Sequence, residues 1–521
     1  MIYFKTKSVV SILRLTLLLF AFPCFIQFGN AQTNQEQHRP QLHFTPPAHW
    51  MNDPNGMVYY KGEYHFFYQY YPDSTVWGPM HWGHAVSKDL VHWEHLPIAL
   101  YPDSLGYIFS GSAVIDVNNT SGFGKKGGES PMVAMYTSHN MANEKAKRMD
   151  IESQSIAYSL DKGRTWTKYG RNPVIKNTGS RDFRDPKVYW NEKIKRWVVV
   201  LAVGGHVEFY NSKDLKDWTL GGKFGENAGS HGGVWECPDL FPLYSKEEQK
   251  TKWILIVNIG NGAPNGGSGS QYFIGDFDGK NFVNDNTPDK ILWQEYGKDN
   301  YAAVTYSNAP DNRRILIGWM SNWQYATVVP TSTWRSATTL PRTLSLHKTP
   351  EGLRLYQKPV SEFTALRTSQ IVIPTSTLKE FKTIEDNSTT NEFDLSFDLE
   401  KTSASNFGIE LSNSKNEKVE IGYDVATKQF YTDRTASGKI NFSKDFSGKF
   451  YAPRSSKSKV LKMHIIVDVA SAELFADEGS VTMTTIFFPN EDFKITKIFS
   501  KNGETQLTKG NIWHLKSIFG Y

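Results

Sequence analysis

Short apolar stretches that alternate with polar positions dominate this chain, and helical periodicity is scarce. In "EFDLSFDLE" the side chains of Phe393, Leu395, Phe397 and Leu399 alternate with acids and serine. A period of two with one polar face predicts a β-strand that covers a core on one side. The segment "MHIIVDVASAELFAD" predicts a strand, a turn and another strand in the same way. The pattern therefore predicts an all-β protein.

A short phrase recurs before residue 340 and divides the strand-like runs into groups. "SKDLVHW" ends at Trp93, "SLDKGRTW" at Trp166 and "SKDLKDW" at Trp218, and "GDFDGKNF", which ends at Phe282, is a degenerate fourth copy. Each copy places an acid in a tight turn before an aromatic residue that starts the next strand. The intervals of 73, 52 and 64 residues are too irregular for a solenoid. They fit the blades of a β-propeller, and about 310 residues at this spacing predict five blades.

The distribution of tryptophan marks a domain boundary. Fourteen of the fifteen tryptophans lie between Trp50 and Trp334, and only Trp513 follows. We therefore predict a five-bladed propeller at residues 32–358 and a C-terminal β-sandwich at residues 359–521. No reactive cluster stands out in the second domain, so structural support or contact with a glycan is its expected role.

The first 31 residues have the composition of a cleavable secretory signal peptide. Lys5, Lys7 and Arg14 accompany an apolar run that ends near Phe25, and "GNA" supplies small residues for cleavage after Ala31. The run is too short for a membrane anchor, and no second hydrophobic span follows it. These features predict a secreted or periplasmic protein without a membrane span.

Charge and cysteine content narrow the expected partners. Removal of the leader takes away three positive charges and no acids, so the formal net charge falls from +5 to about +2. Nucleic acid and membrane surfaces are then not expected as partners, and no feature indicates an obligatory protein partner. Cys237 becomes the only cysteine, which excludes an internal disulfide. Cys24, within the leader, lacks the small preceding residues that lipidation requires.

Three acids stand in constrained surroundings: Asp53 in "WMNDPNG", Asp185 in "FRDPK" and Glu236 in "VWECPDLF". Asp, Asn, Pro and Gly between apolar runs predict a turn at Asp53. Asp53 and Asp185 directly precede proline, which favours an extended backbone at each acid. Singly, each acid is more typical of a structural turn. Together they match the cleavage of a glycosidic bond, which requires a carboxylate facing the anomeric carbon and a protonated acid facing the leaving oxygen.

Seven stretches carry a specific resemblance over residues 43 to 345: "HWMNDPNG", "YHFFYQYYP", "VWGPMHWGHAVSKDLVHWEHLPIAL", "FSGSAV", "FRDPKV", "WECPDLF" and "YAAVTYSN". With them the sequence resembles glycoside hydrolase family 32, the β-fructofuranosidases that include levanases, inulinases and invertases. The resemblance implies a five-bladed propeller, with the site at one end of its axis, and an appended β-sandwich.

The resemblance also implies roles for individual residues. Asp53 would be the nucleophile, Glu236 the general acid and then the base, and Asp185 the stabiliser of the transition state. The reaction would retain configuration through a covalent fructosyl-enzyme intermediate, with two carboxyl groups about 5 to 5.5 Å apart whose repulsion raises one pKa. The residues implied to hold the terminal fructose are Asn52, Gln69, Trp77, Phe109, Ser110 and Arg184.

The leading hypothesis is an exo-acting β-fructosidase with a fructan, levan or inulin, or sucrose as its substrate. The alternatives are an endo-acting fructanase, a transglycosylating relative and a non-catalytic fructan-binding propeller. The presence of all three acids speaks against the non-catalytic alternative. Neither a metal nor a cofactor is expected, because paired carboxylates need none and the histidines in the tryptophan-rich strands lack a ligand pattern. These histidines are His81, His84, His92 and His95. Cys237 is expected to be a buried, inert thiol rather than a nucleophile.

Overall fold

The computed structural model describes residues 1–3, 34–384 and 388–519. From Gln35 onward these residues form one compact unit, to which the description below refers. The predicted signal peptide lies, apart from residues 1–3, outside the described residues. Among the residues that are described, no helix has the length and apolar character needed to cross a membrane.

Residues up to Pro359 form a group of mainly antiparallel sheets, here called the N-terminal sheets, in which, among the described strands, only the pairs β1–β20 and β13–β21 are parallel. The first three sheets comprise β1 (His49–Tyr60), β2 (Glu63–Tyr71), β3 (His81–Ser87), β4 (Trp93–Leu100) and β20 (Trp334–Arg335); β5 (Tyr107–Ile115), β6 (Met132–His139), β7 (Glu152–Ser159) and β8 (Thr167–Lys168); and β9 (Phe183–Asn191), β10 (Arg196–Val203), β11 (His206–Ser212) and β12 (Trp218–Phe224). Four short helical segments connect or follow these strands: α1 (Met141–Lys145), η1 (Pro310–Asn312), η2 (Ala326–Val328) and η3 (Ser361–Leu366).

A larger sheet completes this group. Its strands are β13 (Trp235–Ser245), β14 (Lys250–Ile259), β15 (Gly269–Phe277), β16 (Phe282–Asn284), β17 (Leu292–Trp293), β18 (Tyr301–Thr305), β19 (Ile315–Trp319), β21 (Arg342–Thr349) and β22 (Gly352–Pro359). Its two halves meet through a single pair, Ser245 on β13 and Leu346 on β21.

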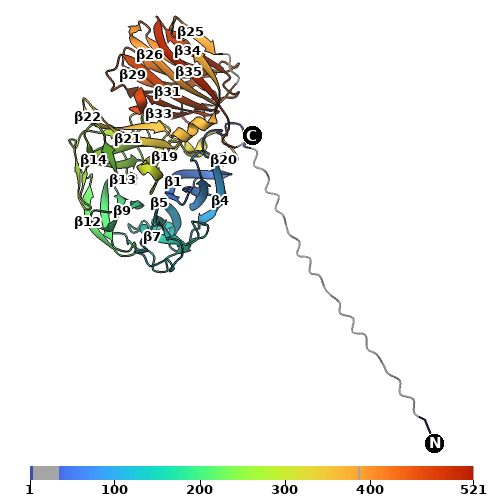
Figure 1. The fold of residues 1–521 in the computed structure, drawn as a ribbon, viewed down its shortest axis with the longest axis vertical. Helices are drawn as coiled ribbons and strands as arrows, with labels where there is room; N and C mark the ends of the chain where they lie inside the picture. Colours follow the sequence, from blue (N-terminus) through green and yellow to red (C-terminus); the bar gives the residue numbers. More distant parts are fainter. Residues whose placement is uncertain (4–33, 385–387, 520–521) are drawn as a thin grey trace. The chain divides into compact units, whose positions relative to one another are not determined.

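Five strands line the centre of the N-terminal sheets. They are β1, β5, β9, β13 and β18, and each contacts the next in that order, with β18 returning to β1. The remaining strands of each sheet lie progressively farther outward (Figure 1). A closed cycle of inner strands brings residues that are far apart in sequence to one central region.

The recurring phrase forms the same turn in four sheets. In each sheet the turn stands immediately before a strand at the edge, which is β4, β8, β12 or β16. The side chains of Asp89, Asp161, Asp214 and Asp278 each accept a hydrogen bond from a backbone N–H three or four residues later. β4 begins at Trp93, β8 follows Trp166, β12 begins at Trp218 and β16 begins at Phe282. The turn and strand start predicted from the repeats are therefore confirmed.

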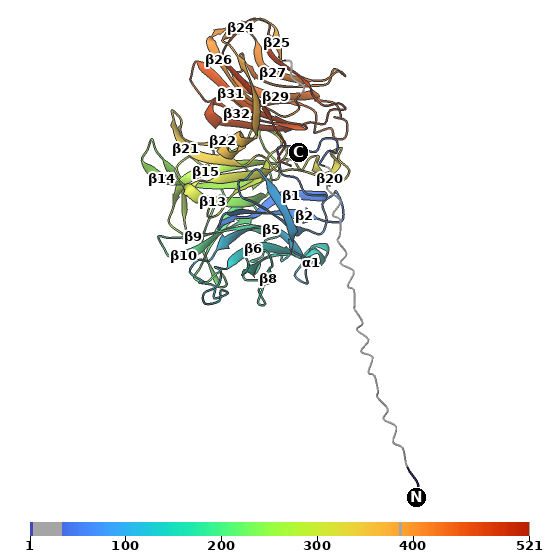
Figure 2. The same cartoon turned by 45° about the vertical axis from the view of Figure 1, so that its right-hand side comes forward.

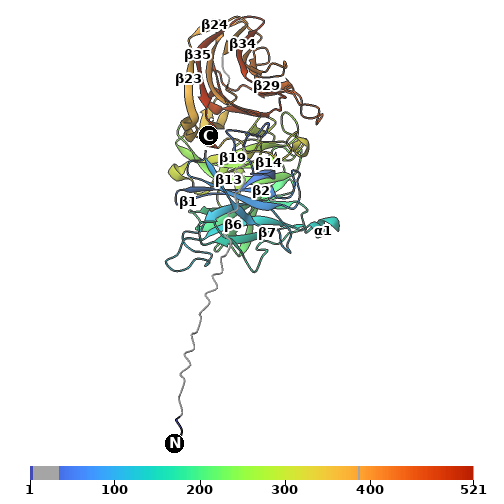
Figure 3. The ribbon, with the colours of Figure 1, turned by 90° about the vertical axis from the view of Figure 1, so that its right-hand side faces the viewer.

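Two further sheets, the C-terminal sheets, pack face to face (Figures 2 and 3). One contains β23 (Arg367–Ile373), β24 (Ser376–Leu378), β26 (Asn391–Thr402), β31 (Val460–Asp468), β32 (Ser471–Ala476), β33 (Val481–Ile486) and β35 (Thr505–Leu515), with η4 (Asp477–Gly479) between β32 and β33; the other contains β25 (Phe381–Ile384), β27 (Asn406–Ser412), β28 (Lys418–Asp424), β29 (Gln429–Ala436), β30 (Lys449–Pro453) and β34 (Ile495–Lys501). Phe397 of β26 meets Phe407 of β27 with ring centroids 4.7 Å apart in their shared core. Phe393, Leu395 and Phe397 are fully buried, as their alternation predicts.

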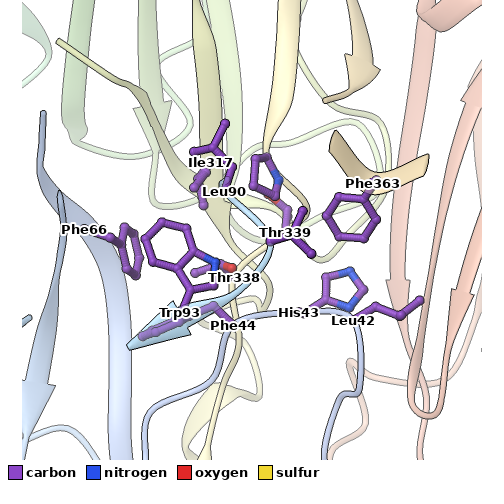
Figure 4. A pocket seen from close by; sticks show the side chains of 12 residues that line it. Leu42, His43, Phe44, Phe66, Leu90, Trp93, Ile317, Thr338, Thr339 and Phe363 are labelled. Carbon is purple, nitrogen blue, oxygen red and sulfur yellow. The ribbon is translucent and has the colours of Figure 1, made fainter. Parts of the chain in front are cut away.

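Buried ion pairs join the N-terminal and C-terminal sheets. His43 lies between two carboxyl groups, with Nδ1 2.7 Å from Asp468 and Nε2 3.0 Å from Glu473. Arg342 on β21 lies 2.6 Å from Glu473 and 2.9 Å from Glu295. Beside His43, Leu42, Thr339 and Phe363 line a cavity of about 10 Å³, the space of one water molecule (Figure 4).

Candidate active site

The three predicted acids lie on three of the five inner strands, near the start of each. Asp53 is on β1, Asp185 on β9 and Glu236 on β13. The thiol of Cys237 connects two of them, since its sulfur lies 3.5 Å from Asp53 Oδ2 and 3.6 Å from Asp185 Oδ2. Arg184 connects the others, with Nη2 3.0 Å from Glu236 Oε1 and Nε 4.0 Å from Asp185 Oδ2. The structure therefore brings all three acids together.

A register shift interrupts every inner strand at this end. The shifts lie between Met51 and Pro54 in β1, Ile108 and Gly111 in β5, and Tyr301 and Val304 in β18. In β9 the shift falls at Asp185 and Pro186, and in β13 at Cys237 and Pro238. A β-bulge adds an unpaired residue and redirects side chains, so the bulges turn several side chains towards one point.

The bulges correct two sequence-based expectations. "WMNDPNG" was predicted to form a turn, but it belongs to strand β1, and its Asn52 and Asp53 occupy the bulge instead. Asp185 was predicted to be extended because Pro186 follows it. Its φ is 65°, in the left-handed region, because two residues of the bulge fit opposite Leu201 of β10. Bulge geometry outweighs the local preference before proline.

Asp53 is held by neutral donors. Asn52 donates from Nδ2 to Oδ1 at 2.9 Å, and Ser110 donates from Oγ to Oδ2 at 2.6 Å. Trp50 Nε1 in turn donates to Asn52 Oδ1 at 2.8 Å, which fixes the amide. Burial raises the pKa of Asp53, the bonds from Ser110 and Asn52 lower it, and the charge of Glu236 raises it further. The two donors thus favour the ionised carboxylate against the effect of burial.

Asp185 is the most deeply placed of the three acids, with 6% of its surface exposed. Its Oδ2 accepts a hydrogen bond of 2.8 Å from the Cys237 N–H, and its own N–H donates to Thr137 Oγ at 3.0 Å. Burial raises its pKa to about 8, because the opposing charge of Arg184 is partly cancelled by Glu236 and Asp53. Burial and the two neighbouring carboxyl groups thus favour the protonated form of Asp185, and Arg184 opposes them.

Glu236 is bonded to charged and phenolic donors and is partly open to solvent. Arg184 donates to Oε1 from Nη2 at 3.0 Å and from Nε at 3.3 Å. Tyr301 donates its hydroxyl to Oε2. Arg184 is itself held at 2.6 Å by Asp182. The side chain of Glu236 is 21% exposed, so part of its carboxyl group remains open to solvent.

The remaining predicted binding residues surround strand β5. Phe109 stacks on His139 with ring centroids 4.1 Å apart, and Trp77 meets Phe109 edge to face at 6.0 Å. Trp77 is 37% exposed, which leaves part of its ring open at the rim. Gln69 is buried and donates to the Ile108 carbonyl at 3.0 Å, so its contact is with the strand rather than with the three carboxyls.

Two residues of this network, Tyr301 and Glu152, were not predicted as part of the site. Tyr301 heads "YAAVTYSN", a stretch recognised as a motif but not as part of the site. Glu152 is buried and accepts hydrogen bonds from His139 Nδ1 at 3.1 Å and from the Phe183 N–H at 2.7 Å. It also lies 3.4 Å from Arg184, so it orients the guanidinium that contacts Glu236. The only available signal was an acid at the start of a strand-like run.

The histidines and the cysteine can also be placed. Within the described ranges, no group of three His, Cys, Asp or Glu side chains is arranged to hold a metal ion. Cys237 is buried, as predicted. Burial raises the pKa of its thiol, and the charges of Asp185, Asp53 and Glu236 raise it further, so the thiol stays protonated. A protonated thiol is a poor nucleophile.

Paired carboxyl groups on a cycle of inner strands, one bonded to neutral donors and the other to an arginine and a tyrosine, are the arrangement expected of a glycoside hydrolase. The chain belongs to glycosyl hydrolase family 32, because the model of that family's N-terminal domain matches residues 43–359 and the model of its C-terminal domain matches residues 362–514. The mostly β structure thus comprises an N-terminal and a C-terminal family 32 domain, and the chain is an enzyme of the β-fructofuranosidase and fructanase class.

Individual relatives agree with the family. The chain is 48% identical to a levanase of Bacillus subtilis, over 99% of this chain and 76% of that protein. It is 40% identical to an extracellular exo-inulinase of Aspergillus awamori, over 92% of this chain and 95% of that protein. The crystal structure of the exo-inulinase from Aspergillus awamori superposes with a TM-score of 0.86 at 38% identity, covering 93% of this chain and 99% of that one. The family resemblance predicted from the motifs is confirmed.

Proposed function

We propose that the protein is an exported, retaining exo-β-fructosidase that releases fructose from levan, inulin or sucrose. The observation that carries the proposal is the unequal bonding of two neighbouring acids, Asp53 to Ser110 and Asn52 and Glu236 to Arg184 and Tyr301. The similarity to a levanase and to extracellular exo-inulinases supports the substrate, the exo mode and the export. The apolar leader with its predicted cleavage after Ala31 also supports export.

The proposed architecture is a five-bladed propeller at residues 32–358 followed by a β-sandwich at residues 359–521. The cyclic contacts of β1, β5, β9, β13 and β18 support five blades, one for each inner strand. The shared core of the two C-terminal sheets supports the sandwich.

The first chemical step forms a covalent intermediate. Protonated Glu236 gives its proton to the leaving oxygen while Asp53 attacks C2 of the fructosyl unit. The C2–O bond breaks, a C2–O bond to Asp53 forms, and the leaving alcohol departs with the proton. Asp53 is suited to this role because the hydrogen bonds from Ser110 and Asn52 favour its ionised form against burial and Glu236, which together raise its pKa. Both donors come from neighbouring bulged strands, so the carboxylate is oriented before substrate arrives.

The second step releases fructose. Glu236, now ionised, takes a proton from water as the water oxygen attacks C2, and the bond to Asp53 breaks. Arg184 and Tyr301 stabilise the ionised Glu236 during this stage. Asp185 contacts ring hydroxyls as the oxocarbenium-like state develops.

The proposed fructose subsite is built from the residues around these acids. Trp77 and Phe109 offer apolar ring surface, while the other members supply polar contacts. The full set is Asn52, Gln69, Trp77, Phe109, Ser110 and Arg184.

Timed product analysis on levan, inulin and sucrose tests the proposal. We expect fructose as the only early product from levan and inulin, and equal amounts of fructose and glucose from sucrose. The matched control is Asp53→Asn, which keeps the side-chain shape and is expected to release no fructose while unfolding at the same temperature as wild type. A ladder of oligosaccharides at early times overturns the exo mode. Near-normal fructose release by the variant overturns the role of Asp53.

A further inference from the structure

A large hollow lies at the opposite end of the inner strands from the carboxyl groups. Along β9 the chain runs from Asp185 to Asn191, which six residues at a rise of about 3.3 Å place roughly 20 Å away. β5 runs from Ser110 to Val114 and β13 from Glu236 to Pro242 in the same sense. The far residues of these strands line a hollow of about 550 Å³. On β9 and β13 its lining begins at Lys187 and Asp239, two and three residues beyond Asp185 and Glu236, and it includes neither the three acids nor the side chains bonded to them, so it is separate from the catalytic site.

Buried polar atoms at the base of the hollow lack partners. Lys187 Nζ lies 3.3 Å from Asp239 Oδ2, which also accepts a hydrogen bond of 2.5 Å from the Thr305 N–H. Among the described residues, the other oxygen, Asp239 Oδ1, and the nitrogen Nε of Arg314 have no hydrogen-bond partner. Asp239 is fully buried. Groups of this kind are normally paired, so both point to a missing partner.

The kind of partner follows from what is unpaired. Asp239 Oδ1 accepts and Arg314 Nε donates, and both belong to residues that line the hollow. An anion pairs with the arginine and repels the carboxylate, whereas a cation does the reverse. A hydroxyl group both donates and accepts, so a ligand with several hydroxyls satisfies both atoms.

Aromatic rings supply the other half of a sugar site. Tyr189 and Trp253 lie with ring centroids 5.3 Å apart, and both line the hollow together with Trp190. All three are half-buried, so part of each ring stays open. Val117 at the rim is 68% exposed, which leaves the hollow accessible from solvent. The C–H faces of sugars pack on such rings while their hydroxyls reach polar atoms.

We infer that this hollow is a second, non-catalytic site for a neutral sugar ring. The ring packs against Trp253 and Tyr189, and its hydroxyls bond to Asp239 and Arg314. On a polymeric substrate the site holds the chain at the face opposite to the carboxyls, and so retains the enzyme on the polymer. A disaccharide is turned over without it.

Electrophoresis through native gels that contain levan or inulin tests the inference. The full-length protein carries Asp53→Asn so that the polymer is not consumed. Adding Trp253→Ala should reduce retardation about three- to tenfold, the effect of losing one aromatic contact. The matched control is Tyr244→Ala, which removes a 56% exposed aromatic from β13 outside the hollow and should leave retardation unchanged. In the active enzyme, Trp253→Ala should leave kcat/KM for sucrose unchanged.

A milder variant guards against misfolding. Tyr189→Phe keeps the ring and removes only the hydroxyl, and it should reduce retardation about twofold. Crystals soaked in fructose should show a sugar on Trp253. Retardation equal to that of the Asp53→Asn parent in both variants overturns the inference, and a sugar in the crystal without any change in retardation means binding at crystal concentration only. Failure of the proposed hydrolysis appears separately, as absent sucrose turnover.

Discussion

His43 is expected to make the stability of the protein depend on pH between 6.5 and about 9. Burial alone lowers the pKa of this histidine, but hydrogen bonds and charges from Asp468 and Glu473 outweigh burial and raise the pKa from 6.5 to about 9. At about 1.4 kcal/mol per pH unit, this difference corresponds to about 3 kcal/mol of folding free energy. Because the folded state binds the proton more tightly, the contribution is complete below pH 6.5 and is lost as pH rises through 9.

Urea unfolding of wild type and His43→Gln from pH 6 to pH 9.5 measures this contribution. We expect the stability difference between the two proteins to shrink by about 3 kcal/mol across the range. His347→Gln is the control, since His347 pairs with Glu247 at the surface with 40% of its side chain exposed. The free energy of unfolding of His347→Gln should stay within about 1 kcal/mol of the wild-type value across this pH range. If the free energy of unfolding of His43→Gln changes with pH in parallel with that of wild type, His43 is not charged in the folded protein and the expected pH dependence is refuted.

Three other substitutions test the site. Glu236→Ala should slow sucrose hydrolysis about 100-fold or more but an activated aryl fructoside far less, because a good leaving group needs no proton; equal losses would count against acid catalysis. Tyr301→Phe should lower kcat about tenfold with little change in KM, measured by initial rates, and an unchanged kcat would exclude a role for its bond to Glu236. Gly56→Ala should cost about 3 kcal/mol in urea unfolding, since its Cβ would lie 2.6 Å from Phe67 at a φ of 54°, and an unaffected midpoint would refute that clash.

Local patterns were predictable where one short-range rule decides the structure. The aspartate turns at Asp89 and Asp214 follow from side chains that bond to the next backbone amides, and both form as predicted. Phe393 and Leu395 are buried because a strand places alternate side chains on one face. Asp53 was identified because its neighbours are unusual in both residue type and order.

The bulges could not be predicted, because they depend on pairing between strands. Proline in strand-like sequence marks an interrupted ladder, and Pro54, Pro186 and Pro238 indeed lie at or beside three of the shifts. The sequence alone does not say which side chains the bulges turn inward. The positions of Tyr301 and Glu152 follow from how inner strands meet in space, so neither could be assigned beforehand.

The salt bridges beneath β21 bear on how the enzyme can be engineered. Arg434 of β29, in the C-terminal sheets, lies 2.6 Å from Asp299, which precedes β18 of the N-terminal sheets. Both side chains are fully buried. Deleting the C-terminal sheets would remove the arginine that neutralises Asp299 and would leave Arg342 with Glu295 as its remaining acidic partner. The C-terminal sheets therefore stabilise the N-terminal sheets that carry the site. Shortened or chimeric versions of the enzyme must keep both groups of sheets.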